Sequence, residues 1–125
     1  MDGKQRKIAL LARTRPEQGT KTVALTGKKE GLPGIPMSEL SAHQMGQVRK
    51  TLNDLLAMFR KKDAKEAMKL VEAGGFDHLH VAFYKNHDIG DDNVWDVWQI
   101  EGPNCLCFFR GAPHVHVWVN IKKPA

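Results

Sequence analysis

The sequence predicts an α+β fold, in which N-terminal helices pack on a four-stranded antiparallel β-sheet with meander connections. Three observations lead to this class. Apolar residues recur at three- and four-residue spacing in the first half of the chain, the pattern alternates as in strands after Gly74-Gly75, and the connectors between the last strands are short. We therefore expect a single domain over residues 1–125, with a helical layer at about 4–75 and the sheet at about 76–121.

The first elements along the chain are short. Residues 4–12 place apolar side chains on one side after a basic start, which indicates a helix. Residues 20–25 are expected to form a short strand. Residues 27–36 contain three glycines and two prolines, and this composition predicts a loop.

Two longer helices should follow and form a hairpin. Ser41 and Gln44 make a capping-box pattern, and the amphipathic spacing after them predicts a helix over 42–60. A second helix is expected to begin at Asp63, with Glu66 three residues later, and to end before Gly74-Gly75.

The remaining residues alternate as strands do. The expected strands are 78–85, 94–100, 104–109 and 114–121. The first connector, 86–93, is long and acidic. The other two, 101–103 and 110–113, are short enough to join antiparallel neighbours, so the last three strands should form a meander.

Three pairs of potential metal ligands lie in these strands, each with its members two residues apart. Side chains at positions i and i+2 of a strand point to the same face, so each pair presents both ligands on one side. Imidazole and thiolate groups suit copper and zinc. The pairs therefore predict a metal site, and its candidate ligands are His114, His116, His78, His80, Cys107 and Cys105.

A four-residue loop at 110–113 would place two of these pairs on one face. It pairs Cys107 with His116 and Cys105 with Trp118, so both cysteines would share a face with His114 and His116. The same register carried through the Gly102-Pro103 turn pairs Ile100 with Cys105 and Trp98 with Cys107.

The favoured ligand set is His114 and His116 with either His78 or His80. Three ligands leave a coordination position open, as a catalytic metal requires, and copper is favoured over zinc. The main hypothesis is therefore a metal-binding domain that could act as a metal-dependent redox enzyme or hydrolase, with the question of catalysis left open. The alternative is a non-catalytic protein-interaction module without metal, which predicts an exposed apolar patch or an unpaired edge strand.

The composition limits which classes of binding partner are expected. The net charge is +5, but the basic residues are spread out and aromatic residues make up only 7% of the chain, which disfavours nucleic acid. The chain has no apolar run of ~18 residues, so no membrane partner is expected. A metal ion is the expected partner, with a small-molecule substrate and a homo-oligomer left open. A cytoplasmic location is the default, and a periplasmic or secreted one applies if a leader has been removed.

Several motifs in this order resemble the C-terminal part of an uncharacterised bacterial domain-of-unknown-function family. They are Leu40-Ser41-Ala42-His43-Gln44, the strand over 76–83, the Ile100-Glu101-Gly102-Pro103 turn and the closing His114-Val115-His116. Members of that family look like longer proteins with an Ile-x-Gly-Pro turn and a His-x-His ending. The resemblance implies no established activity, but it raises the importance of His114 and His116.

Overall fold

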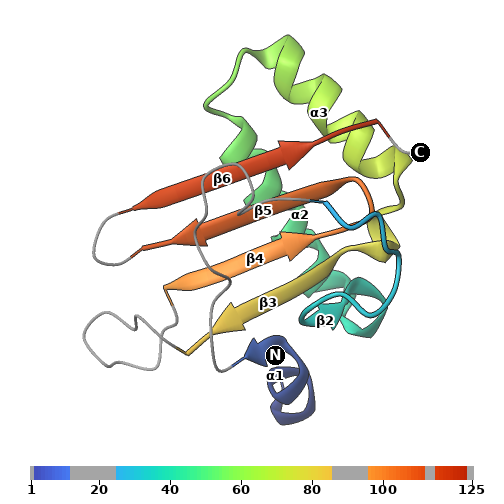
Figure 1. The fold of residues 1–125 in the computed structure, drawn as a ribbon, viewed down its shortest axis with the longest axis vertical. Helices are drawn as coiled ribbons and strands as arrows, with labels where there is room; N and C mark the ends of the chain where they lie inside the picture. The colour runs from blue at the N-terminus through green and yellow to red at the C-terminus, as the bar shows by residue number, and fades with distance from the viewer. Residues whose placement is uncertain (1, 12–24, 86–95, 112–114, 124–125) are drawn as a thin grey trace.

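The computed structural model describes residues 2–11, 25–85, 96–111 and 115–123, and it has an α+β fold (Figure 1). The predicted class is therefore confirmed. The helices are α1 (Gly3–Ala9), α2 (Ala42–Leu56) and α3 (Lys61–Ala73), with short 3₁₀ turns η2 (Met37–Glu39) and η3 (Phe76–His78). Helices α2 and α3 lie behind the sheet in the view of Figure 1.

Within the described residues, the sheet is mixed and has six strands. These are β1 (Leu10–Leu11), β2 (Ile35–Pro36), β3 (His80–Tyr84), β4 (Val97–Glu101), β5 (Cys105–Arg110) and β6 (His116–Ile121). Strands β3 to β6 form the expected antiparallel meander, but β1 pairs with β3 in parallel and β2 pairs with β3 in the antiparallel sense. The prediction of a purely antiparallel four-stranded sheet is thus wrong, because two-residue strands leave no alternating pattern in a sequence.

The helix boundaries differ from the predictions at several ends. The Ser41 capping box is confirmed, but α2 ends at Leu56. Helix α3 begins at Lys61, two residues before the predicted start, and ends at Ala73, with Gly74 as its C-cap. Asp63 lies in its first turn and accepts a hydrogen bond from Arg60 Nε at 2.9 Å. The first helix stops at Ala9 because the next two residues pair with β3. Most of the short strand expected at 20–25 lies outside the described residues.

The first strand of the meander begins later than predicted. It starts at His80, and His78 lies in the preceding 3₁₀ turn. Gly75 enters this turn with φ of 99°, a conformation that L side chains rarely adopt, and a side chain there would also press against the His78 ring. The two members of the first predicted ligand pair are therefore not neighbours on one strand.

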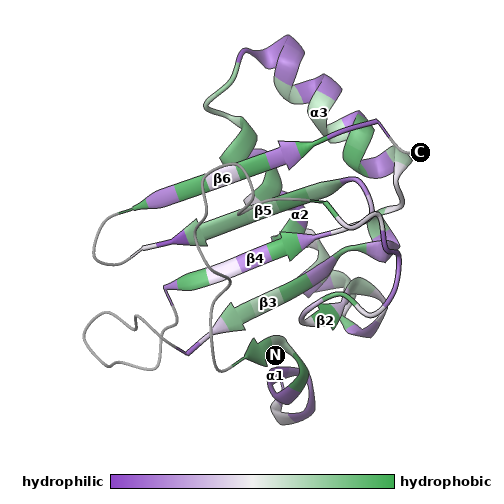
Figure 2. Ribbon diagram, in the orientation of Figure 1, coloured by the Kyte–Doolittle hydropathy of each residue, from purple (hydrophilic) through white to green (hydrophobic). Residues whose placement is uncertain are grey.

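The sheet buries both of its faces. On the helix side, Leu52 of α2 and Val71 of α3 pack with Ile100, Cys105 and Cys107. On the other side, a second apolar cluster is formed by Ala82, Tyr84, Val97, Leu106 and Phe108. Figure 2 shows the result: β5 is hydrophobic along most of its length, while β4 carries a polar stretch within a hydrophobic strand.

The strand register differs from the predicted one at two pairings, and only one of these differences changes which residues share a face. Ile100 pairs with Cys107 and not with Cys105, a shift of two residues that leaves both on the same face. Cys107 pairs with Val119 and not with His116. This shift is of three residues, and an odd shift moves one strand's side chains to the opposite face. The error arose from the assumed four-residue loop, since pairing in fact begins between Arg110 and His116.

Candidate functional site

The two cysteines lie in the core between the sheet and the helices. Both are buried, and both belong to the cluster that contains Leu52 and Val71. Burial raises the pKa of Cys105 and of Cys107 to about 12. Because the thiolate is the form that attacks electrophiles, these thiols are poorly disposed to act as nucleophiles near neutral pH.

His80 and His116 lie on the opposite face of the sheet, away from the cysteines. His80 is on β3 and His116 is on β6, and strands β4 and β5 separate them. Three strand spacings amount to ~14 Å, whereas two donors on one zinc or copper ion lie within about 5 Å of each other. As placed, these two imidazoles do not meet at a common ion.

Arg110 occupies one ring nitrogen of His116. Its guanidinium can only donate, so Arg110 Nη2 donates a hydrogen bond to His116 Nδ1 at 2.6 Å. A neutral imidazole that accepts at Nδ1 carries its proton on Nε2. A metal ion at His116 would therefore have to displace either this cation or this proton.

The environment of His80 is different. Its Nδ1 donates to the backbone carbonyl of His78 at 3.0 Å, which leaves Nε2 as the acceptor nitrogen of the neutral ring. Its direct partner across the β3–β4 pairing is Glu101, a carboxyl group that is only 1% exposed. Within the described ranges, however, no group of three or more His, Cys, Asp or Glu side chains is arranged to hold a metal ion. His114 lies outside those ranges, and the copper or zinc site stays a prediction.

The buried polar side chains of this face satisfy one another. Tyr84 Oη donates to Gln99 Oε1 at 2.7 Å, and Gln99 Nε2 donates to Glu101 Oε1 at 3.0 Å. Such a chain of hydrogen bonds offsets the cost of burying an amide and a carboxyl group. It also explains the polar stretch of β4 in Figure 2.

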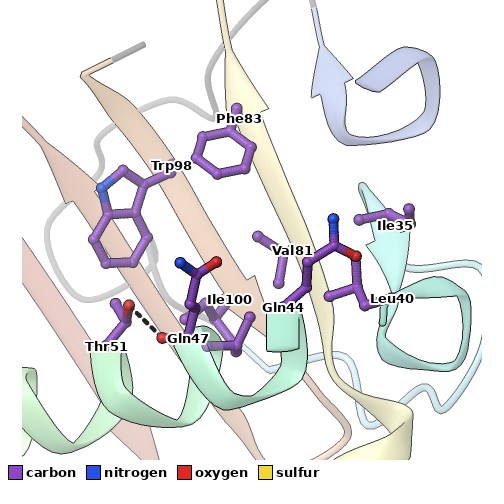
Figure 3. A pocket seen from close by; sticks show the side chains of 10 residues that line it. Ile35, Leu40, Gln44, Gln47, Thr51, Val81, Phe83, Trp98 and Ile100 are labelled. Carbon is purple, nitrogen blue, oxygen red and sulfur yellow. Dashed lines mark hydrogen bonds between the residues drawn. The ribbon is translucent and has the colours of Figure 1, made fainter. Parts of the chain in front are cut away.

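The helix side of the sheet contains a hollow that the sequence analysis did not anticipate. Figure 3 shows it between α2 and the sheet, with Trp98 and Phe83 on one side and Leu40 and Ile35 on the other. Its volume is about 330 Å³, which is within the range of small-molecule sites. Its full lining is Ile35, Leu40, Gln44, Gln47, Val48, Thr51, Val81, Phe83, Trp98 and Ile100.

The floor of this hollow arises from the strand register. Phe83 pairs with Trp98, Trp98 with Phe109, and Phe109 with Val117, so one row of large side chains crosses β3 to β6. The neighbouring row, which includes Ile100 and Cys107, is buried beneath the helices. Helix α2 thus covers the row that contains Ile100 and Cys107, and it leaves the row that contains Trp98 half-buried.

Polar groups lie only at the rim of the hollow. Gln44 accepts hydrogen bonds from the backbone of Ser41 and from Gln5, so it is held in place by the helix cap. Thr51 Oγ1 donates to the Gln47 carbonyl at 2.9 Å, while the Gln47 side chain is exposed. The rim is uncharged here, and an apolar ligand group could enter without displacing an ion pair.

The sequence contains a signal for this row. Trp98 was expected to pair with Cys107, and Phe109 lies two residues after Cys107 in the same expected strand, so both belong to the face of the predicted ligands. They do share a face. Because side chains alternate between the two faces along a strand, the sequence predicted that both rings point to one side of the sheet. What the sequence could not show is how far α2 reaches across that side.

Comparison with known proteins adds no relative. No protein-family model, no curated protein and no solved structure matches the chain. The resemblance to a bacterial family therefore stays a prediction, and function must be argued from the geometry. None of the helices in the described part of the chain is long and apolar enough to cross a membrane.

Proposed function

We propose that this protein is a non-catalytic binding module and that the hollow between α2 and the sheet receives an apolar group of its ligand. The observation that carries the proposal is the half-buried row of Phe83, Trp98 and Phe109 beside a cavity of about 330 Å³. A well-formed apolar cavity with a few polar groups at its rim is the usual form of a ligand site.

Two further features fit a binding module. Val115 and Met58 are apolar side chains, yet they are 65% and 70% exposed. Strand β6 is also the last strand of the sheet order. Both features are those expected from the interaction-module alternative.

The test is an NMR titration of the isotope-labelled protein with indole, a small neutral aromatic probe. We expect amide and side-chain shifts at Gln47, Thr51 and Trp98, with a Kd of about 1 mM or tighter, which corresponds to about 4.1 kcal/mol of binding free energy. Shifts confined to the opposite face, or none at all, would contradict the proposal.

A pair of variants makes the titration specific. Thr51→Trp places a large ring at the rim of the hollow, whereas Asn53→Trp places the same ring on an exposed position of the same helix. We expect the first variant to weaken indole binding by about tenfold or more and the second to leave it unchanged. If indole bound to the two variants with equal affinity, its binding site would lie outside the hollow.

A further inference from the structure

The hollow continues beyond the end that Figure 3 shows. A second hollow of about 260 Å³ shares Thr51 and Trp98 with the first. Its other lining residues are Asp54, Leu55, Met58, Phe109 and Val117. The two hollows are therefore adjacent beside α2, and the row of Phe83, Trp98, Phe109 and Val117, which we call the aromatic row, runs across their floor. We call the two hollows together the α2 groove.

The length of the α2 groove favours an elongated occupant. Its floor crosses from β3 to β6, which is three strand spacings or ~14 Å. That distance matches about nine residues of an α-helix or about four residues of an extended chain. A small molecule the size of indole would fill only one part of it.

The groove ends beside a basic turn. Met58 lines the groove, and it is followed by Arg60, directly before α3, and by Lys61 and Lys62, the first two residues of α3. Arg60 is engaged by Asp63 at 2.9 Å, whereas Lys61 and Lys62 are exposed and, among the described residues, take part in no ion pair. The acidic side chain in the groove wall, Asp54, is already paired with Lys50 at 2.8 Å. The net field at this end is therefore positive.

Charge and shape separate the candidate occupants. A second copy of the chain would bring two basic turns and two net charges of +5 together. A nucleic acid needs exposed ring faces for stacking, but Trp98 and Phe109 stack on each other at 5.2 Å and 16°. A membrane surface is broad, whereas the aromatic row is the floor of a groove beside α2.

We propose that the α2 groove binds a segment of a partner protein that combines apolar side chains with acidic ones. The apolar side chains would lie along Phe83, Trp98 and Phe109, and the acidic ones would lie against Lys61 and Lys62. This inference rests on the proposed function, since it names the partner of the same site. An amphipathic helix laid in an apolar groove is a common mode of peptide recognition.

The experiment is a selection from a phage-displayed library of random peptides of about 16 residues, long enough for four helical turns. The whole 125-residue chain is the bait, and binders that also bind the Thr51→Trp variant are removed. We expect the enriched peptides to pair aromatic or aliphatic residues at helical spacing with Asp or Glu near one end. Enrichment of peptides without acidic residues, or no enrichment, would overturn the inference.

Two double variants then test the charge requirement on the best synthetic peptide. Lys61→Glu/Lys62→Glu should weaken its binding by about tenfold at low salt and less at high salt, because salt screens exposed charges. Lys28→Glu/Lys29→Glu removes an exposed lysine pair elsewhere and should have little effect. Equal losses in the two double variants would overturn the inference.

The outcomes distinguish a failure of this inference from a failure of the proposed function on which it rests. If indole does not bind in the hollow, the proposed function itself fails. If indole binds but no peptide depends on Thr51 and on the lysine pair, only the acidic polypeptide partner is refuted. Binding to phosphatidylcholine–phosphatidylserine vesicles that Thr51→Trp abolishes would likewise replace the polypeptide with a membrane surface.

Discussion

Cys105 and Cys107 show how burial controls the chemistry of a side chain. Both lie against apolar residues of α2 and α3, and desolvation is the largest cause of their raised pKa. The same two residues in an exposed loop would be reactive thiols. Their two-residue spacing therefore predicted correctly that they share a face. The spacing alone could not predict whether that face is buried or exposed to solvent.

The thiols predict a specific pH dependence of stability. Their pKa is about 12 in the folded protein against an ordinary value of 9.0, so above pH 9 the unfolded chain releases protons that the folded chain keeps. The free energy of unfolding should therefore fall as pH rises from 9 towards 12, by up to about 1.4 kcal/mol per pH unit for each thiol. Urea denaturation at a series of pH values measures it.

The control for that measurement is the Cys105→Ala/Cys107→Ala variant. It loses some packing at every pH, but it lacks the thiol contribution. The difference in unfolding free energy between the natural chain and the variant should consequently shrink above pH 9. Two parallel curves would show that the thiols do not titrate in this way.

Asn104 ties α3 to the end of the sheet. Its Nδ2 donates to the carbonyls of Leu70 at 2.7 Å and of Lys122 at 2.8 Å, and the residue is buried. We expect Asn104→Ala to lower the free energy of unfolding by about 1–3 kcal/mol, because it removes two hydrogen bonds that each contribute about 0.5–1.5 kcal/mol. Asn53→Ala, at an exposed position of α2, is the control and should change it by less than about 0.5 kcal/mol.

At the scale of elements, α2 is the one the sequence described best. Its capping box and its amphipathic spacing are local features, and the observed helix begins where they place it. The strands β1 and β2 could not be predicted, since each is only two residues long and is defined by its contact with β3. The β5–β6 register failed because it depended on a loop length that no local pattern fixes.

The cap at the start of α2 gives a prediction at this scale. Ser41 Oγ accepts from the Gln44 backbone, and the Gln44 side chain accepts from the Ser41 backbone. Ser41→Ala should lower the free energy of unfolding by about 1 kcal/mol. It should also lower the affinity of the groove for indole, because the cap holds Gln44, which forms part of the rim. Chemical denaturation measures the first effect and indole affinity the second, while Ser38→Ala at an exposed position should change neither.

For the whole molecule, the sheet separates the predicted ligands into two sets. The cysteines face the helices, whereas His80 and His116 lie on the other face and three strand spacings apart. The prediction of a metal site came from spacings within expected strands, which held for the cysteines but not for His78, and from a register between strands, which was wrong. The candidate groove required the placement of α2 over the sheet, which only the folded chain provides.

This arrangement leads us to expect little metal in the purified protein. Elemental analysis of protein made without a histidine tag should find copper and zinc well below one ion per chain. A stoichiometric metal that disappears in the His114→Ala/His116→Ala variant would restore the metal-binding hypothesis. It would also require Arg110 to leave the ring nitrogen that it now occupies.

Intermolecular nuclear Overhauser effects test most directly whether an apolar group enters the α2 groove. With indole bound, we predict contacts from its ring protons to the methyl groups of Thr51 and Val81 and to the Trp98 ring, all of which line the hollow. Contacts to Leu106 or Phe108 on the far face, or no intermolecular contacts at saturating indole, would contradict the proposed function.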